Sequence, residues 1–524
     1  MAQKAEKTEV IIVGAGAAGS VMAAVLAEAG RRVVVLEAGP ARRLDGLVSS
    51  QIWARRNKWV TPAVIEAGAQ KIGHNFNAGF GLGGAALHHY GVWPRLHEDD
   101  FIEQSRFGQG LDWPLTYGEL RPFYDEIQRQ VGLAGDAVAE VWRPPGAPYP
   151  LPPLEVLEQG RTLARGFAAL DLRTAPIPMA VLSRDHQGRP GCIYDGWCDA
   201  GCPTGALANP LVTYLPRARR AGAELRADCA VLRVLTDRKG GRAEAVDYVD
   251  GDGVRRRLYG DLIVLAAFAV QTPRLLLNSA NAAHPDGLAN RNGLVGAYVM
   301  THPATSVSGL FDHQTEPYMG LTGGQLICQD GYAKDGYEAG FGSGQWLIGQ
   351  ALKPNGLLGM AMSRADLFGA ALDDFMRRAA GHMATMVSVS EDLPQRQNRV
   401  TLSSKKDKFG MPLAHVVHNT HEASLTRWRL AVAQGRRIIK AAGAREVWNG
   451  PLAPMHLMGG TIMGRKAATS VTNSYGQTHE VANLMIAGPG LFPTSGAVNP
   501  TFTVHALALR AARHALADWS AIVG

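Results

Sequence analysis

The 524-residue sequence has few cysteines and no long run of apolar or of basic residues. Five cysteines are too few to build a disulfide framework for a chain of this length. The longest apolar stretch, Leu262 to Val270, is far shorter than the roughly 20 residues needed to cross a bilayer. The amino-terminal residues MAQKAEKTEV hold no apolar segment of a secretory signal. We therefore expect no membrane span and no signal peptide in this chain, which either stays in the cytoplasm or is carried out folded by a partner.

Charge and composition exclude further classes of protein. The 53 Lys and Arg exceed the 46 Asp and Glu, which gives a formal net charge of +7, but no segment concentrates the excess. A nucleic-acid-binding protein normally concentrates such charge on one face or element. Apolar residues make up 46% and charged residues 19%, which is the balance of a globular protein and not of a disordered chain. We expect a folded protein that does not bind nucleic acid.

A dinucleotide-binding unit is predicted near the amino end. Val10 to Val13 and Val33 to Leu36 are typical of short buried strands, and Ser20 to Ala29 is typical of a helix. A G-x-G-x-x-G motif follows the first strand, where its glycines permit a tight turn, the approach of a pyrophosphate and close helix packing. Glu37 closes the second strand, from which a carboxylate reaches a ribose hydroxyl. A purely structural loop is the alternative. The motif glycines are Gly14, Gly16 and Gly19.

The same glycine pattern recurs at Gly79, Gly81 and Gly84, without an apolar strand before it or a helical period after it. We therefore do not predict a second nucleotide-binding fold. A flavoenzyme of the disulfide-reductase kind would need such a second unit and a redox-active cysteine pair after the first. The sequence shows neither feature.

The rest of the chain indicates further strands and helices. Residues 222–264 alternate as strands and lead into Leu262 to Val270, which we predict as one buried strand. Residues 305–450 mix strand-like runs with helices over Ala370 to Ala380 and Glu422 to Ala442, which favours a second domain. The last helix is predicted to begin near Pro500.

Three of the five cysteines fall within eleven residues, in the segment GCIYDGWCDAGCPTGA. Three thiolates can hold a three-iron cluster, because soft sulfur ligands suit iron–sulfur centres. Inert buried thiols are common, and a structural zinc would need a fourth ligand that nothing nearby clearly supplies. All three interpretations stay open from the residues alone. The cysteines are Cys192, Cys198 and Cys202.

Motifs along the whole chain resemble those of the glucose-methanol-choline (GMC) oxidoreductase family, and most of all the flavoprotein subunits of bacterial FAD-dependent glucose and gluconate dehydrogenases. The resemblance implies an α/β fold: a Rossmann-like FAD-binding domain, in the two-domain architecture shared with p-hydroxybenzoate hydroxylase, and a mixed-sheet α+β substrate domain. The FAD-binding domain would comprise residues 1–105, 203–300 and 451–524, with a cysteine-bearing connector over 106–202 and the substrate domain over 301–450. The matching segments are VGAGAAGS with LEAGP, LGGAALHHYG, DWPLTYGELRPFYD, LAAFAVQTPRLLLNSA, EDLPQRQNRVTLS, HLMGGTIMG and NLMIAGPGLFPTSGAVNPTFTVHALALR.

The resemblance also implies which residues surround FAD. Gly83 and Gly84 would pass close to the isoalloxazine, and the backbone at Val231 would meet the adenine. His88 stands where some relatives attach flavin covalently, and Phe268 stands where many members have glycine. The amino end of the last helix would supply partial positive charge to an anionic reduced flavin. The cofactor-binding residues implied are Gly14, Gly16, Ala18, Gly19, Glu37, Ala38, Gly83, Gly84, His88, Val231, Gly488, Pro500 and Thr501.

His456 and Asn499 match the catalytic pair of the family. Oxidation of an alcohol by hydride transfer requires that the hydroxyl proton leave, and a neutral imidazole such as His456 can accept it. Asn499 can hold the oxygen by hydrogen bonding as carbonyl character develops. Only the fold can bring together two residues that lie 43 positions apart in the sequence.

The function implied is an FAD-dependent dehydrogenase that oxidises an alcohol group of a sugar, polyol, aldonate or similar small molecule. Electrons would pass from flavin through a [3Fe–4S] cluster on Cys192, Cys198 and Cys202 to a cytochrome or quinone. A small chaperone-like subunit that carries an export signal would place the protein at the periplasmic face of the inner membrane. One alternative is an oxidase of the same family that reduces O₂ and has no cluster. Another is a flavin-binding structural subunit without turnover.

Overall fold

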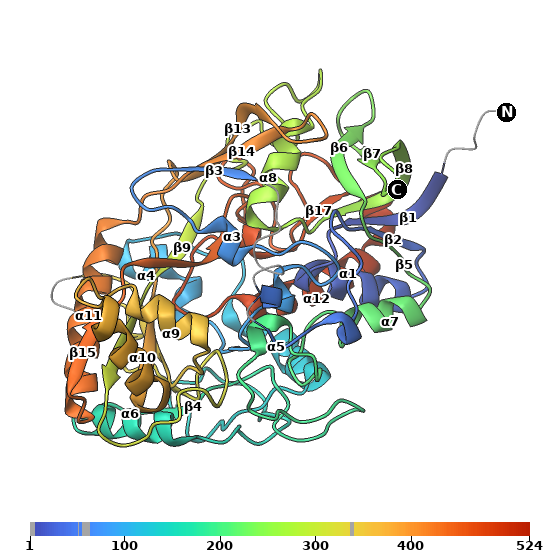
Figure 1. The fold of residues 1–524 in the computed structure, drawn as a ribbon. Helices are drawn as coiled ribbons and strands as arrows, with labels where there is room; N and C mark the ends of the chain where they lie inside the picture. The colour runs from blue at the N-terminus through green and yellow to red at the C-terminus, as the bar shows by residue number, and fades with distance from the viewer. Residues whose placement is uncertain (1–5, 51, 55–62, 336–339) are drawn as a thin grey trace.

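The computed structural model describes residues 6–50, 52–54, 63–335 and 340–524 (Figure 1). Within this part of the chain the strands form two large sheets and one small sheet, and helices pack on them. The first large sheet joins segments from both ends and the middle of the sequence. Its strands in spatial order are β5 (Glu224–Arg226), β2 (Val33–Leu36), β1 (Glu6–Val13), β8 (Arg255–Leu265), β7 (Ala243–Val249) and β6 (Ala230–Thr236), with β17 (Leu484–Ile486) also paired to β8.

The strands β5, β2, β1, β8 and β17 of this sheet run parallel, and β7 and β6 are antiparallel to their neighbours. Helix α1 (Ala17–Glu28) packs against α12 (Thr501–Ala517) and α7 (Tyr214–Arg220), and α12 packs in turn against α5 (Tyr117–Val131). Parallel strands covered by helices are buried on both faces, which explains why Val10 to Val13 of β1 and the whole of β2 consist of Val, Ile and Leu. The carboxyl ends of β1 and β2 therefore meet at one edge of the core.

The second large sheet is antiparallel. Helix α11 (Glu422–Ala441) packs against β9, β12 and β15, and α6 (Glu158–Ala168) packs against α11 and β12. Figure 1 shows α11 along the outer edge of the molecule, away from α1 and α12. The strands in spatial order are β15 (Glu446–Asn449), β9 (Met300–Leu310), β12 (Met383–Ser390), β11 (Gly344–Ile348), β10 (Leu326–Cys328) and β4 (Ala175–Pro176), with β16 (Ala453–Met458) also paired to β9.

A small sheet packs on helix α8 (Phe268–Asn278), which follows β8. Its strands are β13 (Arg399–Lys406), β14 (Pro412–Val417) and β3 (Val64–Ala67). Helices α9 (Pro354–Ala361) and α10 (Gly369–His382) pack together near one end of the second sheet. The shorter helices are α3 (His74–Asn77), α4 (Glu103–Phe107) and α13 (Trp519–Val523).

The predicted fold class is confirmed, since the chain forms a mixed α/β structure with a βαβ unit at its start and a second, mixed α+β region. The prediction of one strand over Leu262 to Val270 is wrong. Strand β8 ends at Leu265, and α8 begins at Phe268. A continuous apolar run does not by itself distinguish a buried strand from a buried helix. The proposed division into domains stays a prediction. None of the helices within the described ranges combines the length and apolarity of a membrane span.

Two histidines, His505 buried and His89 half-buried, make the fold sensitive to acid. His89 and His505 both pack on Trp93 and lie beside backbone carbonyls, of Ala208 and Thr501 respectively. Burial lowers the pKa of His89 and of His505 to about 4. The unfolded chain binds protons at these rings below an ordinary histidine pKa of about 6.5, whereas the folded chain does not. Their contribution to stability is therefore complete above that value and is lost as pH falls toward 4.

We predict that each ring costs about 2 kcal/mol of unfolding free energy when pH falls from about 7.5 to about 5. Denaturant unfolding of the parent and of His505→Gln at both pH values measures this cost. The variant should lose about 2 kcal/mol less than the parent between the two conditions. Equal losses in both proteins would mean that His505 does not contribute to the pH dependence.

Candidate active site

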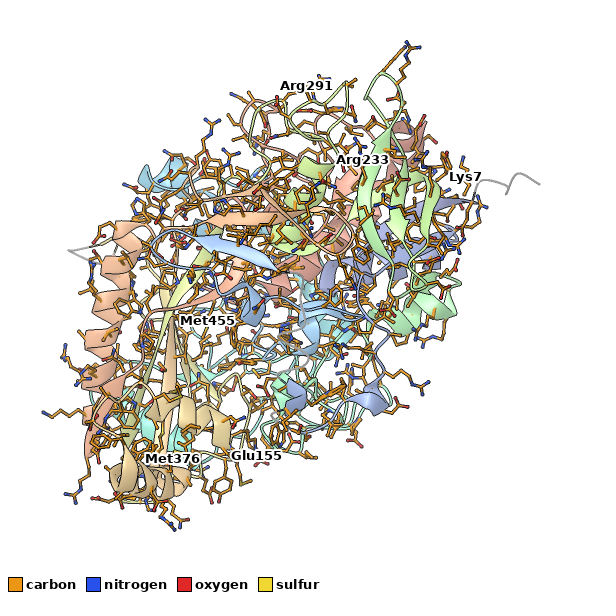
Figure 2. The ribbon with its side chains drawn as sticks, turned by 45° about the horizontal axis from the view of Figure 1, so that its top comes forward. Lys7, Glu155, Arg233, Arg291, Met376 and Met455 are labelled. Atoms are coloured by element: carbon orange, nitrogen blue, oxygen red, sulfur yellow. The ribbon has the colours of Figure 1, made fainter. Side chains whose placement is uncertain are left out.

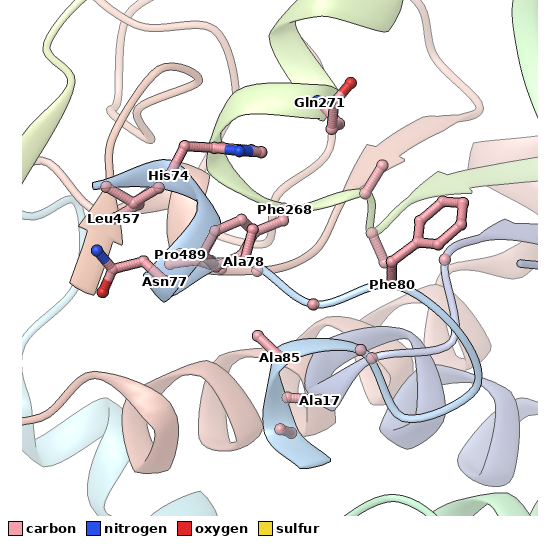
Figure 3. Close-up of a pocket in the computed structure, with 18 of the residues that line it drawn as sticks. Ala17, His74, Asn77, Ala78, Phe80, Ala85, Phe268, Gln271, Leu457 and Pro489 are labelled. Carbon is pink, nitrogen blue, oxygen red and sulfur yellow. The ribbon is translucent and has the colours of Figure 1, made fainter. Parts of the chain in front are cut away.

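A cavity of about 680 Å³ lies at the carboxyl ends of β1 and β2 and reaches the second large sheet. Open parallel sheets bind their ligands at this edge. Figure 3 shows Asn77, Ala78, Phe268 and Pro489 on one side of the hollow and Ala17 and Ala85 on the other. The cavity thus joins the nucleotide-binding end to the residues contributed by β11, β12 and β16.

The glycines of the first motif have different physical roles. Gly14 has a φ of +103°, and a Cβ there would come within 2.5 Å of the carbonyl oxygen of Ala266. A Cβ at Gly19 would come within 2.0 Å of the carbonyl oxygen of Gly14. These two glycines are therefore required by the protein itself. Gly16 has an ordinary φ of −77°, and the nearest atom to a Cβ there is 3.9 Å away. Gly16 lines the cavity, and the packing of the protein alone does not require a glycine there. A glycine at this position is what the close approach of a pyrophosphate would require.

Glu37 joins the two glycine-rich loops. One of its carboxylate oxygens accepts a hydrogen bond from the backbone N–H of Ala15 at 3.0 Å. The other accepts from Gly39 at 2.9 Å and from Gly81 at 3.1 Å. Burial raises the pKa of Glu37, although these three donors oppose the rise. Glu37 thus shapes the loops and also lines the cavity, and its contact with a ribose stays a prediction.

The second glycine-rich stretch forms a wall of the same cavity. Gly81 and Gly83 are left-handed, with φ of +116° and +101°, and a short 3₁₀ helix follows over Gly84–Leu87. The N–H of Gly83 donates to the carbonyl of Ala15 at 3.1 Å, which packs this stretch on the first loop. The element directly before this motif is the short helix α3 and not a strand, so the motif does not stand in a strand–loop–helix unit like that of the first motif.

Most of the predicted cofactor residues line the cavity, whereas Gly19 and Gly83 shape the loops behind its wall. Their roles in binding stay predictions. Phe268 also lines the cavity and has a φ of +74°, a conformation that favours glycine. This explains physically why glycine would suit the position. The predicted residues on the wall are Gly14, Gly16, Ala18, Glu37, Ala38, Gly84, His88, Val231, Gly488, Pro500 and Thr501.

The fold brings His456 and Asn499 together at the cavity. Nε2 of His456 lies 3.2 Å from Nδ2 of Asn499. On the other side, Nδ1 of His456 lies 2.9 Å from Nδ1 of His302, on β9. Nε2 of His302 lies 2.9 Å from the carbonyl oxygen of Gly496, which can only accept a hydrogen bond. No pattern in the sequence singles out His302, which meets His456 because β9 pairs with β16.

These partners select one tautomer of each histidine. The carbonyl of Gly496 requires a proton on Nε2 of His302, so in the neutral ring Nδ1 of His302 accepts from Nδ1 of His456. Nε2 of His456 is then unprotonated and accepts from Asn499. Burial and the neighbouring His302 hold the pKa of His456 well below its ordinary value, so the ring is neutral at physiological pH. The site therefore presents an imidazole lone pair toward Asn499.

The backbone holds His456 in an uncommon conformation. Its φ is +58°, and the β9–β16 pairing is irregular between Met455 and Met458. Asn77, on α3, accepts from the N–H of His456 at 2.7 Å and donates to the carbonyl of Pro454 at 3.3 Å. Strain of this kind persists where surrounding contacts fix it, often at functional sites. Figure 3 shows Asn77 at the edge of the hollow.

We predict that Asn77→Ala slows reduction of the bound flavin roughly tenfold or more, because His456 relaxes away from its position. Flavin content should stay near that of the parent. Asn77→Asp keeps the acceptor for the His456 N–H and loses the donor to Pro454, so its rate should lie between the two. Anaerobic mixing with an alcohol substrate measures the rates. A parental rate in Asn77→Ala would show that Asn77 does not position the base.

The three clustered cysteines lie in one segment with a short 3₁₀ helix over Cys198–Ala200 and join a hydrophobic cluster with Ile327 and Leu347 of the second sheet. Sγ of Cys192 accepts from the N–H of Tyr194 at 3.4 Å, and Sγ of Cys202 accepts from that of Leu207 at 3.3 Å. Burial raises the pKa of Cys192 to about 11 and of Cys198 to about 12, which favours neutral thiols. No group of three or more His, Cys, Asp or Glu in the described part of the chain is arranged to hold a metal ion. As placed, these thiols do not fit a ligand set, and the predicted cluster stays a prediction.

Comparison with known proteins identifies the class to which this fold and site belong. The GMC oxidoreductase family matches residues 8–304 with its amino-terminal part and residues 394–508 with its carboxy-terminal part. The chain belongs to the GMC oxidoreductase family, which confirms the resemblance seen in the sequence. It is an oxidoreductase, and the family, which includes a relative named as a flavoprotein, supports FAD as the cofactor.

Individual relatives cover the whole chain. The sequence is 32% identical to 2-methyl-1,2-propanediol dehydrogenase of Mycolicibacterium austroafricanum, over 100% of this chain and 98% of the relative. It is 30% identical to the fructose dehydrogenase large subunit of Gluconobacter japonicus, over 99% of each. The crystal structure of pyridoxine 4-oxidase from Mesorbium loti matches with a TM-score of 0.68 at 18% identity, over 97% of this chain and 99% of that one. This last likeness shows the fold alone.

Proposed function

We propose that the protein is an FAD-dependent dehydrogenase that oxidises the hydroxyl-bearing carbon of a small alcohol. The observation that carries the proposal is the contact between His456 and Asn499 at the cavity wall, in which Nε2 of His456 carries no proton and accepts from Asn499. The geometry of the glycine loops and Glu37 fits a dinucleotide at the other end of the same cavity.

Side chains of the protein accept the hydroxyl proton of the alcohol and hold its oxygen. FAD, when bound, supplies the acceptor for the hydride. His456 takes the hydroxyl proton on Nε2, and its imidazolium form then donates from Nδ1 to His302. The carbonyl of Gly496 cannot take up a proton, so His302 does not relay one. Instead, the unprotonated Nδ1 of His302 accepts a hydrogen bond from His456 and stabilises its positive charge. Asn499 donates a hydrogen bond to the substrate oxygen and orients it. Pro500 and Thr501, at the amino end of α12, add partial positive charge at the cavity wall.

The walls near the catalytic pair favour a substrate with an apolar body. Leu347 and Val387, paired neighbours on β11 and β12, line the cavity. Met455, which Figure 2 labels, also lines it. The relative named for 2-methyl-1,2-propanediol supports a small diol, and the one named for fructose supports a sugar or polyol. We propose small alcohols with a branched or less polar skeleton before highly hydroxylated sugars and aldonates.

An anaerobic screen of the holoenzyme tests the function. Diols, polyols, sugars, aldonates and aryl alcohols are added one at a time, and loss of the absorbance of oxidised flavin is followed. At least one alcohol should reduce the flavin. Reduction by any alcohol would exclude a structural subunit without turnover, and reduction by none would contradict the dehydrogenase.

The route by which electrons leave is a separate proposal. The sequence predicts a [3Fe–4S] cluster on Cys192, Cys198 and Cys202, then a cytochrome or quinone, with a small chaperone-like subunit bound. The spacing of the three cysteines within eleven residues of the sequence and the relative named as a large subunit support it. Iron and acid-labile sulfide are measured together with peroxide formation in air. Iron in proportion to flavin would support the cluster, whereas iron-free protein that forms peroxide would support the alternative oxidase. A location at the periplasmic face depends on that subunit.

A further inference from the structure

A chain of buried hydrogen bonds leads away from the catalytic pair. Nε2 of Gln345, on β11, lies 3.2 Å from Oδ1 of Asn499. Nε2 of Gln329 lies 3.0 Å from Oε1 of Gln345, and Oε1 of Gln329 lies 3.2 Å from Nε2 of His97. Gln345 and Gln329 are each only 2% exposed. The chain therefore joins His456, Asn499, Gln345, Gln329 and His97 without solvent between them.

The hydrogen bonds of this series all run in the same direction, from donors on the His97 side to acceptors on the His456 side. His456 Nε2 accepts from the amide N–H of Asn499, so Oδ1 of Asn499 must accept from Gln345. Oε1 of Gln345 must then accept from Gln329, and Oε1 of Gln329 from the N–H of His97. Rotation of one amide by half a turn would set oxygen against oxygen on one side and N–H against N–H on the other. Because buried polar groups that lose their partners are costly, the chain has one stable polarity.

His97, at the end of the hydrogen-bonded series away from His456, is held by ring stacking. The ring of His97 lies 3.8 Å from that of Tyr332, with 19° between their planes. The hydroxyl of Tyr332 donates to Asp100 at 2.8 Å. His97 and Gln329 border a second cavity of about 350 Å³. Primary amides do not readily give up and regain protons, so the chain orients groups and does not carry a proton.

We propose that Gln345 is a positioning residue of the reaction, which holds the amide of Asn499 in the orientation that keeps Nε2 of His456 unprotonated. The proposal rests on the proposed function. Without Gln345, Asn499 can rotate and present its oxygen to His456. An oxygen acceptor there favours the tautomer with a proton on Nε2, which cannot take the proton of an alcohol.

Two substitutions of Gln345 test this assignment by anaerobic flavin reduction. Gln345→Leu should slow the limiting rate roughly tenfold or more while flavin stays bound, as is common for residues that orient a reacting group. Gln345→Glu is more specific. A protonated carboxyl can donate to Asn499 and accept from Gln329, as the amide does. An ionised carboxylate can only accept and favours the rotated amide of Asn499.

The rate of Gln345→Glu should therefore be near that of the parent at low pH and fall as pH rises through the pKa of the new carboxyl. Gln325→Glu is the matched control. Gln325 is a buried glutamine next to β10, and among the described residues its side chain bonds only to the backbone, at Leu157 and Gly349. It should keep the pH profile of the parent, whatever its stability. A parental rate in Gln345→Leu, or a parental pH profile in Gln345→Glu, would overturn the proposal.

A second measurement does not depend on turnover. ¹⁵N NMR of histidine-labelled holoenzyme reports the tautomer of His456, with the signal assigned by its loss in His456→Ala. The parent should carry the proton on Nδ1, and Gln345→Leu should shift the population toward Nε2. Unchanged signals in Gln345→Leu would overturn the proposal. If no alcohol reduced the flavin of the parent, the proposed function would fail, and these signals would still decide the role of Gln345.

Discussion

His456→Ala is expected to slow flavin reduction by an alcohol roughly 100- to 10,000-fold while FAD remains bound, as removal of a general base commonly does. The loss arises because Nε2 of His456 is the unprotonated nitrogen that the hydrogen bonds to His302 and Asn499 direct into the site. The glycine loops that face the other end of the cavity are untouched by the change. Rapid anaerobic mixing measures the rate, and the absorbance spectrum measures the flavin content.

His284→Ala is the matched control for this experiment. His284 is also a buried histidine, held by the carbonyl of Gly240 and close to Glu480, away from the catalytic pair. Its removal should lower stability and leave the reduction rate of the folded holoenzyme unchanged. If His456→Ala reduced flavin as fast as the parent, His456 would have no part in the reaction.

Gly16→Val is expected to abolish most FAD binding while the polypeptide still folds. Gly16 has a φ that valine readily adopts, and a Cβ there meets no protein atom closer than 3.9 Å. The added side chain instead occupies the part of the cavity next to the first loop. Overfilling a packed contact costs about 1–3 kcal/mol, which corresponds to a loss of affinity of roughly 5- to 150-fold. Flavin retained after gel filtration, and titration of the apoprotein with FAD, measure the loss.

Gly19→Ala separates this effect from simple misfolding. A Cβ at Gly19 would come within 2.0 Å of the Gly14 carbonyl, so this variant should lose both its flavin and its fold. Gly16→Val should keep the circular dichroism of the parent apoprotein. Full flavin occupancy in Gly16→Val would contradict the placement of the cofactor beside this loop.

Local features of the sequence predicted the nucleotide-binding end well. Strand β2 has the predicted bounds Val33–Leu36, and α12 begins at Thr501, directly after Pro500. The spacing of apolar residues and the positions of glycine and proline determine these elements. Such signals involve only a few neighbouring residues, so they can be recognised in the sequence. Leu262 to Val270 was assigned wrongly because a continuous apolar run carries no period, and the chain turns where Ala266 meets Gly14.

The support of the catalytic pair could not be predicted in the same way. His302 reaches His456 through the register of β9 and β16, and Asn77 does so from a short helix that packs on β16. Gln345 and Gln329 look like ordinary strand residues in the sequence. Their role depends on the contacts of Gln345 with Gln329 and with Asn499. These contacts arise only because β10 pairs with β11 and Asn499 approaches β11 from a distant part of the sequence.

The most direct test of the account is the absorbance of the oxidised flavin after anaerobic addition of the best alcohol from the screen, with hydrogen or deuterium on the carbinol carbon. The account predicts that the absorbance disappears, and that it disappears more slowly with deuterium, because the bond to that hydrogen breaks as the flavin is reduced. An absorbance that no alcohol changes would contradict it.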